Sequence, residues 1–247
     1  MNVQHSYDSK FMNYADRSSR HSARTLSALL RETIGIDSVL DIGCAKGTWL
    51  SAWREAGVQN ILGVDGGYVD TEKLVIPREC FVAADLAQPI DLHRTFALVQ
   101  TLEVAEHIPA DAAEVFVDNL VRHSQGIILF SAAPPGQGGE FHVNEQPYDY
   151  WRAKFRARGF AAYDYLRPLI ARDKAVSFWY RYNVLLFIRD DVGAKLPDSI
   201  RHTRVADSLA IADVSPILFR ARKLLVRALP AAVHRGLARI KARMADR

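Results

Sequence analysis

The chain has 247 residues, of which 49% are hydrophobic, and a formal net charge of +4. This length and apolar content are enough for one large α/β domain with its own core. The first twenty residues are polar, and no uncharged apolar run approaches the ~18 residues of a membrane span, which argues against a secretory signal and a membrane-spanning helix. The two cysteines, Cys44 and Cys80, are expected as buried thiols of a reducing compartment. We therefore expect a cytoplasmic protein.

The charge is unevenly distributed along the chain. Residues 195–247 hold 12 Lys and Arg against 4 Asp and Glu, whereas residues 1–194 hold 20 against 24. The basic character therefore belongs to the tail and not to the rest of the chain. We expect three parts: an N-terminal helical cap over residues 1–35, a core domain over 36–190 and a basic amphipathic tail over 191–247.

Apolar residues alternate between strand-like runs and helical spacing along the core. The expected strands are 38–42, 61–65, 81–84, 96–102 and 126–131. The expected helices are 18–34, 47–57, 110–123 and 148–158. Two further apolar runs, 176–180 and 183–188, are close enough to pair as an antiparallel hairpin. This order predicts the α/β class, with a doubly wound, mostly parallel, seven-stranded sheet that ends in the hairpin.

A turn of small residues follows the first strand. It reads Gly43-Cys44-Ala45-Lys46-Gly47, it comes after Asp41, and the next strand ends on Asp65. Glycines allow the backbone to approach a ligand closely, and an acid after the second strand can accept hydrogen bonds from both ribose hydroxyls. The pattern predicts a nucleotide-cofactor site at the carboxyl edge of the sheet, although the same turn without a ligand would be a plain strand–helix connection.

The spacing from Asp41 to Gly47 resembles motif I, D-x-G-x-G-x-G, of the class I S-adenosylmethionine (SAM) methyltransferases, with Ala45 in place of the middle glycine. The resemblance implies a Rossmann-like methyltransferase fold over residues 36–190 and SAM as the cofactor. It also gives Asp85, which ends the strand 81–84, the position of the acid that binds adenine, although an Asp at a strand end also commonly caps a turn. The implied cofactor contacts are Asp41, Gly43, Cys44, Ala45, Gly47, Asp65, Asp85, Leu86, Leu102 and Glu103.

Acids and histidines gather after the strand 96–102, which runs into Glu103-Val104-Ala105-Glu106-His107. One tight turn can bring both carboxylates and the imidazole together, and His142 lies on the loop after the strand 126–131, which flanks the same edge of the sheet. These groups form a candidate divalent-metal site at Glu103, Glu106, His107 and His142.

This E-x-x-E-H element is similar to that of two methyltransferase families, the ubiquinone-biosynthesis O-methyltransferases and the small-RNA 2′-O-methyltransferases. The resemblance implies an ion of the Mg²⁺ or Mn²⁺ type that binds the acceptor hydroxyls, with His142 as the later histidine. A reading without metal uses the same residues, because a hydroxyl group needs a base or a Lewis acid near its oxygen. The candidate catalytic residues are His107, His142 and Glu106.

A broader resemblance covers about residues 36–190. The segment 130–139 and the strings H-V-N-E-Q (142–146) and W-Y-x-x-N (179–183) look like a bacterial class I methyltransferase subfamily that is often associated with modification of surface polysaccharides or glycolipids. The loop 132–146 offers amides and a carboxylate, followed by aromatic rings, which is a composition that suits a sugar. The residues concerned are Asn144, Glu145, Gln146, Tyr150 and Trp151. The alternative is that Trp151 packs in the core, which we favour for this residue, while Asn144 and Gln146 cap the next helix.

The residues thus predict a SAM-dependent O-methyltransferase that acts on a sugar hydroxyl of a glycan, a glycolipid or a saccharide precursor. Two alternatives remain open. One is a small-molecule or quinone-type O-methyltransferase with the same machinery, and the other is a SAM-binding scaffold of a glycan-assembly complex that transfers no methyl group. The oligomeric state is not predicted.

The tail carries two basic amphipathic stretches. Around residues 215–228, Ile217, Leu218, Leu224, Leu225 and Ala228 share a helical stripe that is flanked by Arg220, Arg222, Lys223 and Arg227, and residues 233–244 repeat the pattern. Such helices can lie on an anionic membrane or cover the domain. Nucleic acid is the weakest option, because the core is net acidic and the tail lacks interleaved aromatic residues. We expect a cytoplasmic protein that is peripheral on the inner face of the membrane.

Overall fold

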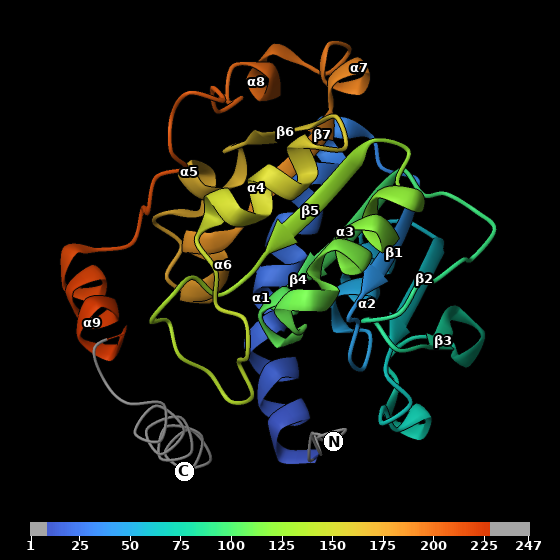
Figure 1. The fold of residues 1–247 in the computed structure, drawn as a ribbon. Coiled ribbons are helices and arrows are strands. Elements are labelled where there is room, and N and C mark those ends of the chain that lie inside the picture. Colours follow the sequence, from blue (N-terminus) through green and yellow to red (C-terminus); the bar gives the residue numbers. More distant parts are fainter. Residues whose placement is uncertain (1–8, 228–247) are drawn as a thin grey trace.

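The computed structural model describes the backbone of residues 9–227 and the side chains of residues 19–227. Its centre is a seven-stranded sheet with the order β3-β2-β1-β4-β5-β7-β6 (Figure 1). β1 to β5 are parallel to one another, and β7 runs antiparallel to both of its neighbours. The strands are β1 (Ser38–Ile42), β2 (Asn60–Asp65), β3 (Phe81–Ala83), β4 (Leu98–Leu102), β5 (Ile127–Ser131), β6 (Phe160–Tyr163) and β7 (Leu185–Arg189).

Helices cover both faces of this sheet, and two hydrophobic cores result. One core joins the sheet to α1, α2, α5 and α6, and the other joins it to α3 and α4. The helices are α1 (Ser9–Ile34), α2 (Thr48–Glu55), α3 (Ala113–Arg122), α4 (Tyr148–Arg156), α5 (Leu166–Ile170), α6 (Phe178–Asn183), α7 (Asp190–Gly193), α8 (Asp198–Arg201) and α9 (Ile217–Arg227). Short 3-10 turns connect several of them.

The period of two along the buried strands explains the two cores. In β1, Val39 faces the first core and Leu40 the second, and both side chains are fully buried. Every residue of β1, β4 and β5 is buried, as expected for a parallel sheet covered on both faces, although β1 and β4 also bury polar side chains, among them Asp41 and Gln100. The predicted fold class is confirmed, and the N-terminal helix packs against α2 within the first core.

One part of the predicted hairpin is wrong. The strand that pairs with β7 is β6, at 160–163, whereas the apolar run 176–180 leads into the helix α6. In α6, Tyr180 and Asn183 are both buried and three residues apart, which is helical spacing. β6 is a four-residue strand with two alanines, and neither its length nor its composition marks a strand clearly.

The tail helix predicted around 215–228 is present as α9. The second predicted tail stretch, 233–244, lies outside the described residues. Among residues 9–227, no helix is both long enough and apolar enough to span a bilayer.

Arg167 ties the carboxyl-terminal elements together from a buried position. Its side chain is only 1% exposed and forms two hydrogen bonds with Asp164, at 2.7 Å each. Its Nη1 atom also donates to the carbonyl oxygens of Tyr182 and Ala212. One guanidinium therefore connects the end of β6, the helix α6 and the segment that leads to α9.

We predict that Arg167→Met lowers the free energy of unfolding by about 3 kcal/mol or more, because the change removes one partner of a buried ion pair and leaves two carbonyl groups unsatisfied. Urea denaturation measures this loss. The control is Arg201→Met, which breaks the exposed pair with Asp198 and should cost no more than about 1 kcal/mol. Equal effects of the two substitutions would contradict the role given to Arg167.

Candidate functional site

The small-residue turn after β1 needs its backbone conformation and its lack of side chains. Gly43 has φ 89°, and a Cβ atom there would lie 2.4 Å from Val104 Cγ2. Ala45 has φ 50°, a left-handed conformation that is costly for a residue with a Cβ atom. Gly47 directly precedes α2, whose first backbone N–H groups face the turn. The turn is thus built for close backbone approach at the carboxyl edge of the sheet.

Two buried acids stand beside this turn. Burial raises the pKa of Asp41 to about 7, and the nearby Asp65 carboxylate adds to the effect. Burial also raises the pKa of Asp65, although hydrogen bonds from Tyr68, Ala45 and Gly66 oppose the shift. The hydroxyl of Tyr68, a residue that is 50% exposed, donates to Asp65 Oδ1. Both Asp65 oxygens thus accept hydrogen bonds in this structure, and a ribose hydroxyl would take the place of the Tyr68 hydroxyl.

The remaining predicted cofactor contacts divide into buried and exposed residues. Cys44, Leu86 and Leu102 are buried, and burial holds the pKa of the Cys44 thiol well above its usual range. Asp85 is exposed, and its Oδ1 atom accepts a hydrogen bond from the backbone N–H of Ala87 at 2.9 Å. Asp85 does cap a turn, and its second oxygen remains at the surface beside β3.

Glu103 ends β4 and belongs to a hydrogen-bonded network of its own. Its carboxylate accepts hydrogen bonds from Gln137 Nε2 at 2.8 Å and from Asn183 Nδ2 at 3.1 Å. Asn183 also donates to Gln137 Oε1, and its own Oδ1 accepts from the hydroxyl of Tyr148. Burial raises the pKa of Glu103, although these donors oppose the shift. Glu103 thus faces α6 and the 132–146 loop.

Glu106, His107 and His142 do come together, and each can place a ligand atom within 4.8 Å of the other two. The side chain of Glu106 is completely buried, and within the described chain neither of its oxygens accepts a hydrogen bond from a side chain. The Nε2 atom of His142 lies 3.9 Å from Glu106 Oε1. Burial, reinforced by the Glu103 carboxylate, raises the pKa of Glu106 well above its usual range, although the backbone N–H groups of Glu106 and Ala133 oppose the shift. Three of the four predicted metal ligands therefore form one cluster, and Glu103 stands outside it.

Hydrogen bonds orient both imidazoles of the cluster. His142 Nδ1 lies 2.8 Å from Glu145 Oε1, and His107 Nδ1 lies 3.3 Å from the carbonyl oxygen of Phe141. Carboxylates and carbonyls only accept, so both Nδ1 atoms donate, and in the neutral tautomer of each ring the lone pair is then on Nε2. Burial disfavours the charge of Glu145, but the His142 hydrogen bond and the amides of Gly136 and Gly138 hold its pKa below its usual range.

The polar residues assigned to the acceptor by sequence are partly occupied inside the loop. Glu145 holds His142, and Asn144 Oδ1 accepts a hydrogen bond from Gln146 Nε2 at 2.9 Å. The helix α4 begins after Pro147 with no side-chain cap, so Asn144 and Gln146 do not cap it. Trp151 is 1% exposed and packs in the second core, as favoured above.

Sequence reasoning missed three residues of the site: Gln137, Tyr148 and Asn183. The signal for Asn183 was present, because the string W-Y-x-x-N ends on it, but the same residues were read as part of an apolar strand run. The contact between Asn183 and Glu103 joins positions 80 residues apart, which no local pattern reveals.

Comparisons with known proteins give the family of the chain. Residues 7–164 match the family described as a methyltransferase domain, so the chain belongs to that family. It is a class I SAM-dependent methyltransferase. A search of the curated proteins finds no match.

Several solved structures share the fold. An O-methyltransferase family protein from Burkholderia thailandensis has a TM-score of 0.53 at 13% identity. The match covers 74% of this chain and 60% of that chain, so this chain spans less than two thirds of that protein. Magnesium protoporphyrin IX methyltransferase from Synechocystis PCC 6803 with bound SAM has 0.52 at 17%, over 76% and 88%. A sugar N-methyltransferase from Streptoalloteichus sp ATCC 53650 has 0.52 at 16%, over 70% and 87%.

Ala45 offers a direct test of strain in the cofactor turn. We predict that Ala45→Gly raises the free energy of unfolding by about 1 kcal/mol, because glycine adopts a left-handed φ without a steric cost. Urea denaturation without SAM measures it. Ala153→Gly is the control: this exposed alanine lies in α4 with ordinary helical geometry, and the change should destabilise by about 1 kcal/mol. Destabilisation by both substitutions would show that Ala45 is not strained.

Proposed function

We propose that this methyltransferase is an O-methyltransferase that acts on a sugar hydroxyl of a glycan, a glycolipid or a saccharide precursor, with a divalent cation held by Glu106, His107 and His142. The observation that carries the proposal is the Glu106 carboxylate, which is fully buried and accepts no hydrogen bond from a side chain of residues 19–227. Two imidazoles that present Nε2 lone pairs lie beside it.

The chemistry of these three side chains favours a bound cation. An isolated ionised carboxylate is costly to bury, so it either takes up a proton or pairs with a cation. Glu145 holds His142 through Nδ1, as the partner of a metal-bound histidine commonly does. When bound, the cation would act as a Lewis acid that lowers the pKa of a coordinated hydroxyl group. With Glu103 turned away, the ligands are one carboxylate and two imidazoles, a set that suits Mn²⁺ or Zn²⁺ better than Mg²⁺.

Methyl transfer from SAM to an alcohol forms a C–O bond as the C–S bond breaks, and the electron pair of that bond stays on sulfur. The hydroxyl proton must leave. With the cation bound, both Nε2 lone pairs are ligands and the acidified hydroxyl gives its proton to solvent, whereas without the cation the Nε2 atom of His142 or His107 takes it. The rest of catalysis is alignment of the acceptor oxygen with the methyl group. The turn at Gly43–Gly47 and the acid Asp65 hold the cofactor. The hydrogen-bonded network of Glu103, Gln137 and Asn183 lies beside the acceptor, at the end of β4.

The saccharide acceptor rests on two further points. The H-V-N-E-Q and W-Y-x-x-N strings resemble the subfamily associated with polysaccharide and glycolipid modification. A sugar N-methyltransferase is among the structural neighbours, although at 16% identity it shares only the fold.

The decisive assay follows radiolabelled methyl from SAM into fractionated extract of the host cell, with and without EDTA. We predict label in a polysaccharide or glycolipid fraction and at least a tenfold loss when EDTA is present, because the hydroxyl then loses its Lewis acid. Label that survives EDTA would refute the cation but keep the transferase. Label confined to small aromatic or quinone fractions would refute the saccharide acceptor.

Metal binding can be measured apart from turnover. We predict that Mn²⁺ binds the purified protein at one site by calorimetry, and that Glu106→Gln weakens the affinity at least tenfold, because an amide oxygen replaces the anionic ligand. Glu140→Gln is the matched control, since Glu140 lies on the 132–146 loop with His142 but outside the cluster. Equal affinities for the two variants would place the ion elsewhere.

A further inference from the structure

The helix α9 packs against the domain through Phe219 and Lys223 and leaves a purely aliphatic face in solvent. Lys223 is 5% exposed and forms an ion pair with Asp213, and Phe219 contacts the rings of Phe178 and Tyr182. On the opposite side of the helix, the exposed side chains are Ile217 (74%), Leu218 (85%), Leu224 (64%) and Leu225 (71%). A helix that merely covers the domain would turn its leucines inward and its cations outward, and α9 does the opposite with these four side chains and Lys223.

These four side chains, which we call the outer face of α9, form one contiguous stripe. Residues seven apart share a helix face, which pairs Ile217 with Leu224 and Leu218 with Leu225, and the two pairs lie on adjacent rows of the helix. Single exposed leucines are ordinary on protein surfaces, but a grouped apolar stripe on one helix marks an interaction surface. Figure 1 shows α9 at the edge of the molecule, beyond α6.

Positive charge flanks the outer face. Arg220 and Arg227 are exposed, and neither has an acidic partner among residues 19–227. Arg222 is also exposed, but its Nη1 atom donates to the carbonyl oxygen of Gln137. An apolar stripe between arginines matches an anionic lipid surface, where the leucines enter the acyl boundary and the cations meet the headgroups.

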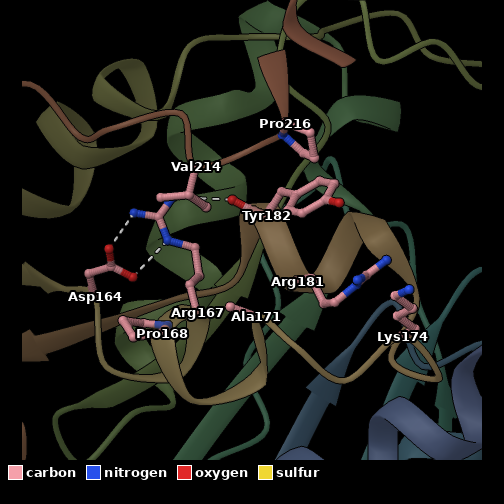
Figure 2. Close-up of a pocket in the computed structure, with 9 residues that line it drawn as sticks. All are labelled: Asp164, Arg167, Pro168, Ala171, Lys174, Arg181, Tyr182, Val214 and Pro216. Carbon is pink, nitrogen blue, oxygen red and sulfur yellow. Dashed lines mark hydrogen bonds and ion pairs between the residues drawn. The ribbon is translucent and has the colours of Figure 1, made fainter. Parts of the chain in front are cut away.

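A cavity of about 670 Å³ adjoins the beginning of α9 and adds to this positive charge. Val214 and Pro216, which lead into the helix, form part of its wall (Figure 2). Asp164, the single acid of the lining, is bound to Arg167. Lys174 and Arg181 extend along one side of it without an acidic partner in the described chain. The cavity therefore offers two uncompensated cations to an anionic group.

We propose that this end of the protein docks on an anionic lipid bilayer. The outer face of α9 enters the headgroup boundary, and the cavity beside it receives the phosphate of a lipid headgroup through Lys174 and Arg181. The inner side of α9 rests on the 132–146 loop, because a Cβ atom on Gly136 would lie 2.2 Å from the carbonyl oxygen of Lys223. Docking thereby brings the loop that carries His142 to the membrane surface, while the lipid binding itself does not depend on the proposed methyl acceptor.

Sedimentation of the full chain with vesicles tests the proposal. We expect strong binding to vesicles of phosphatidylcholine with 30% phosphatidylglycerol, and at least tenfold weaker binding to phosphatidylcholine alone. The double variant Leu218→Ser with Leu225→Ser should lose at least tenfold in partitioning to the anionic vesicles. The control Leu209→Ser removes a leucine that is 62% exposed but lies outside the outer face, and it should change nothing.

The variant Lys174→Gln with Arg181→Gln tests the cavity, and it should weaken binding to the anionic vesicles at least threefold while leaving SAM binding intact. Unchanged partitioning in the α9 double variant would overturn the proposal, because another part of the chain would then bind the lipid. The proposal would also fail if the wild-type protein ignored vesicles but formed a dimer in sedimentation velocity that the α9 variant abolished. That result would assign the outer face to a second copy of the chain.

Discussion

The buried carboxylate of Glu106 is the constraint around which the site is arranged. It lies at the carboxyl end of the parallel sheet, where desolvation disfavours its charge, and no side chain within the described residues donates a hydrogen bond to it. The backbone of the same residue fixes the facing loop, because the amides of Val143 and Asn144 both donate to the Glu106 carbonyl oxygen at 2.9 Å. Those two bonds hold His142 over the carboxylate, and Glu145 then sets the orientation of the imidazole.

Backbone strain is concentrated around this constraint. Among the described residues, four other than glycine have a left-handed φ, and three of them, Ala45, Glu103 and Phe141, belong to the cofactor turn, the end of β4 and the loop beside His107. Such conformations cost free energy and persist only where surrounding structure holds them. The two hydrophobic cores supply that support, because β1, β4 and β5 are buried over their whole length. The site therefore depends on a rigid sheet edge.

Sequence reasoning recovered the parts of the fold that local patterns determine. The five parallel strands were visible as mostly apolar runs that end at acids or small residues, and the E-x-x-E-H spacing brought Glu106 and His107 together in one short turn. It failed where tertiary contacts decide. β6 forms because β7 lies beside it, α6 turns Asn183 toward Glu103, and Glu103 accepts those donors in place of joining the histidines. The orientation of α9 about its axis could not be predicted either, since an amphipathic pattern does not say which face of the helix packs on the domain.

A crystal structure grown with Mn²⁺ and S-adenosylhomocysteine would test the central claim most directly. The account predicts an anomalous difference peak between Glu106, His107 and His142, with the cofactor product over the turn at Gly43–Gly47 and Asp65 on its ribose. A structure with the product bound and no peak at these three residues under saturating Mn²⁺ would contradict it, and Glu106 would then be a protonated acid in the wall of the pocket.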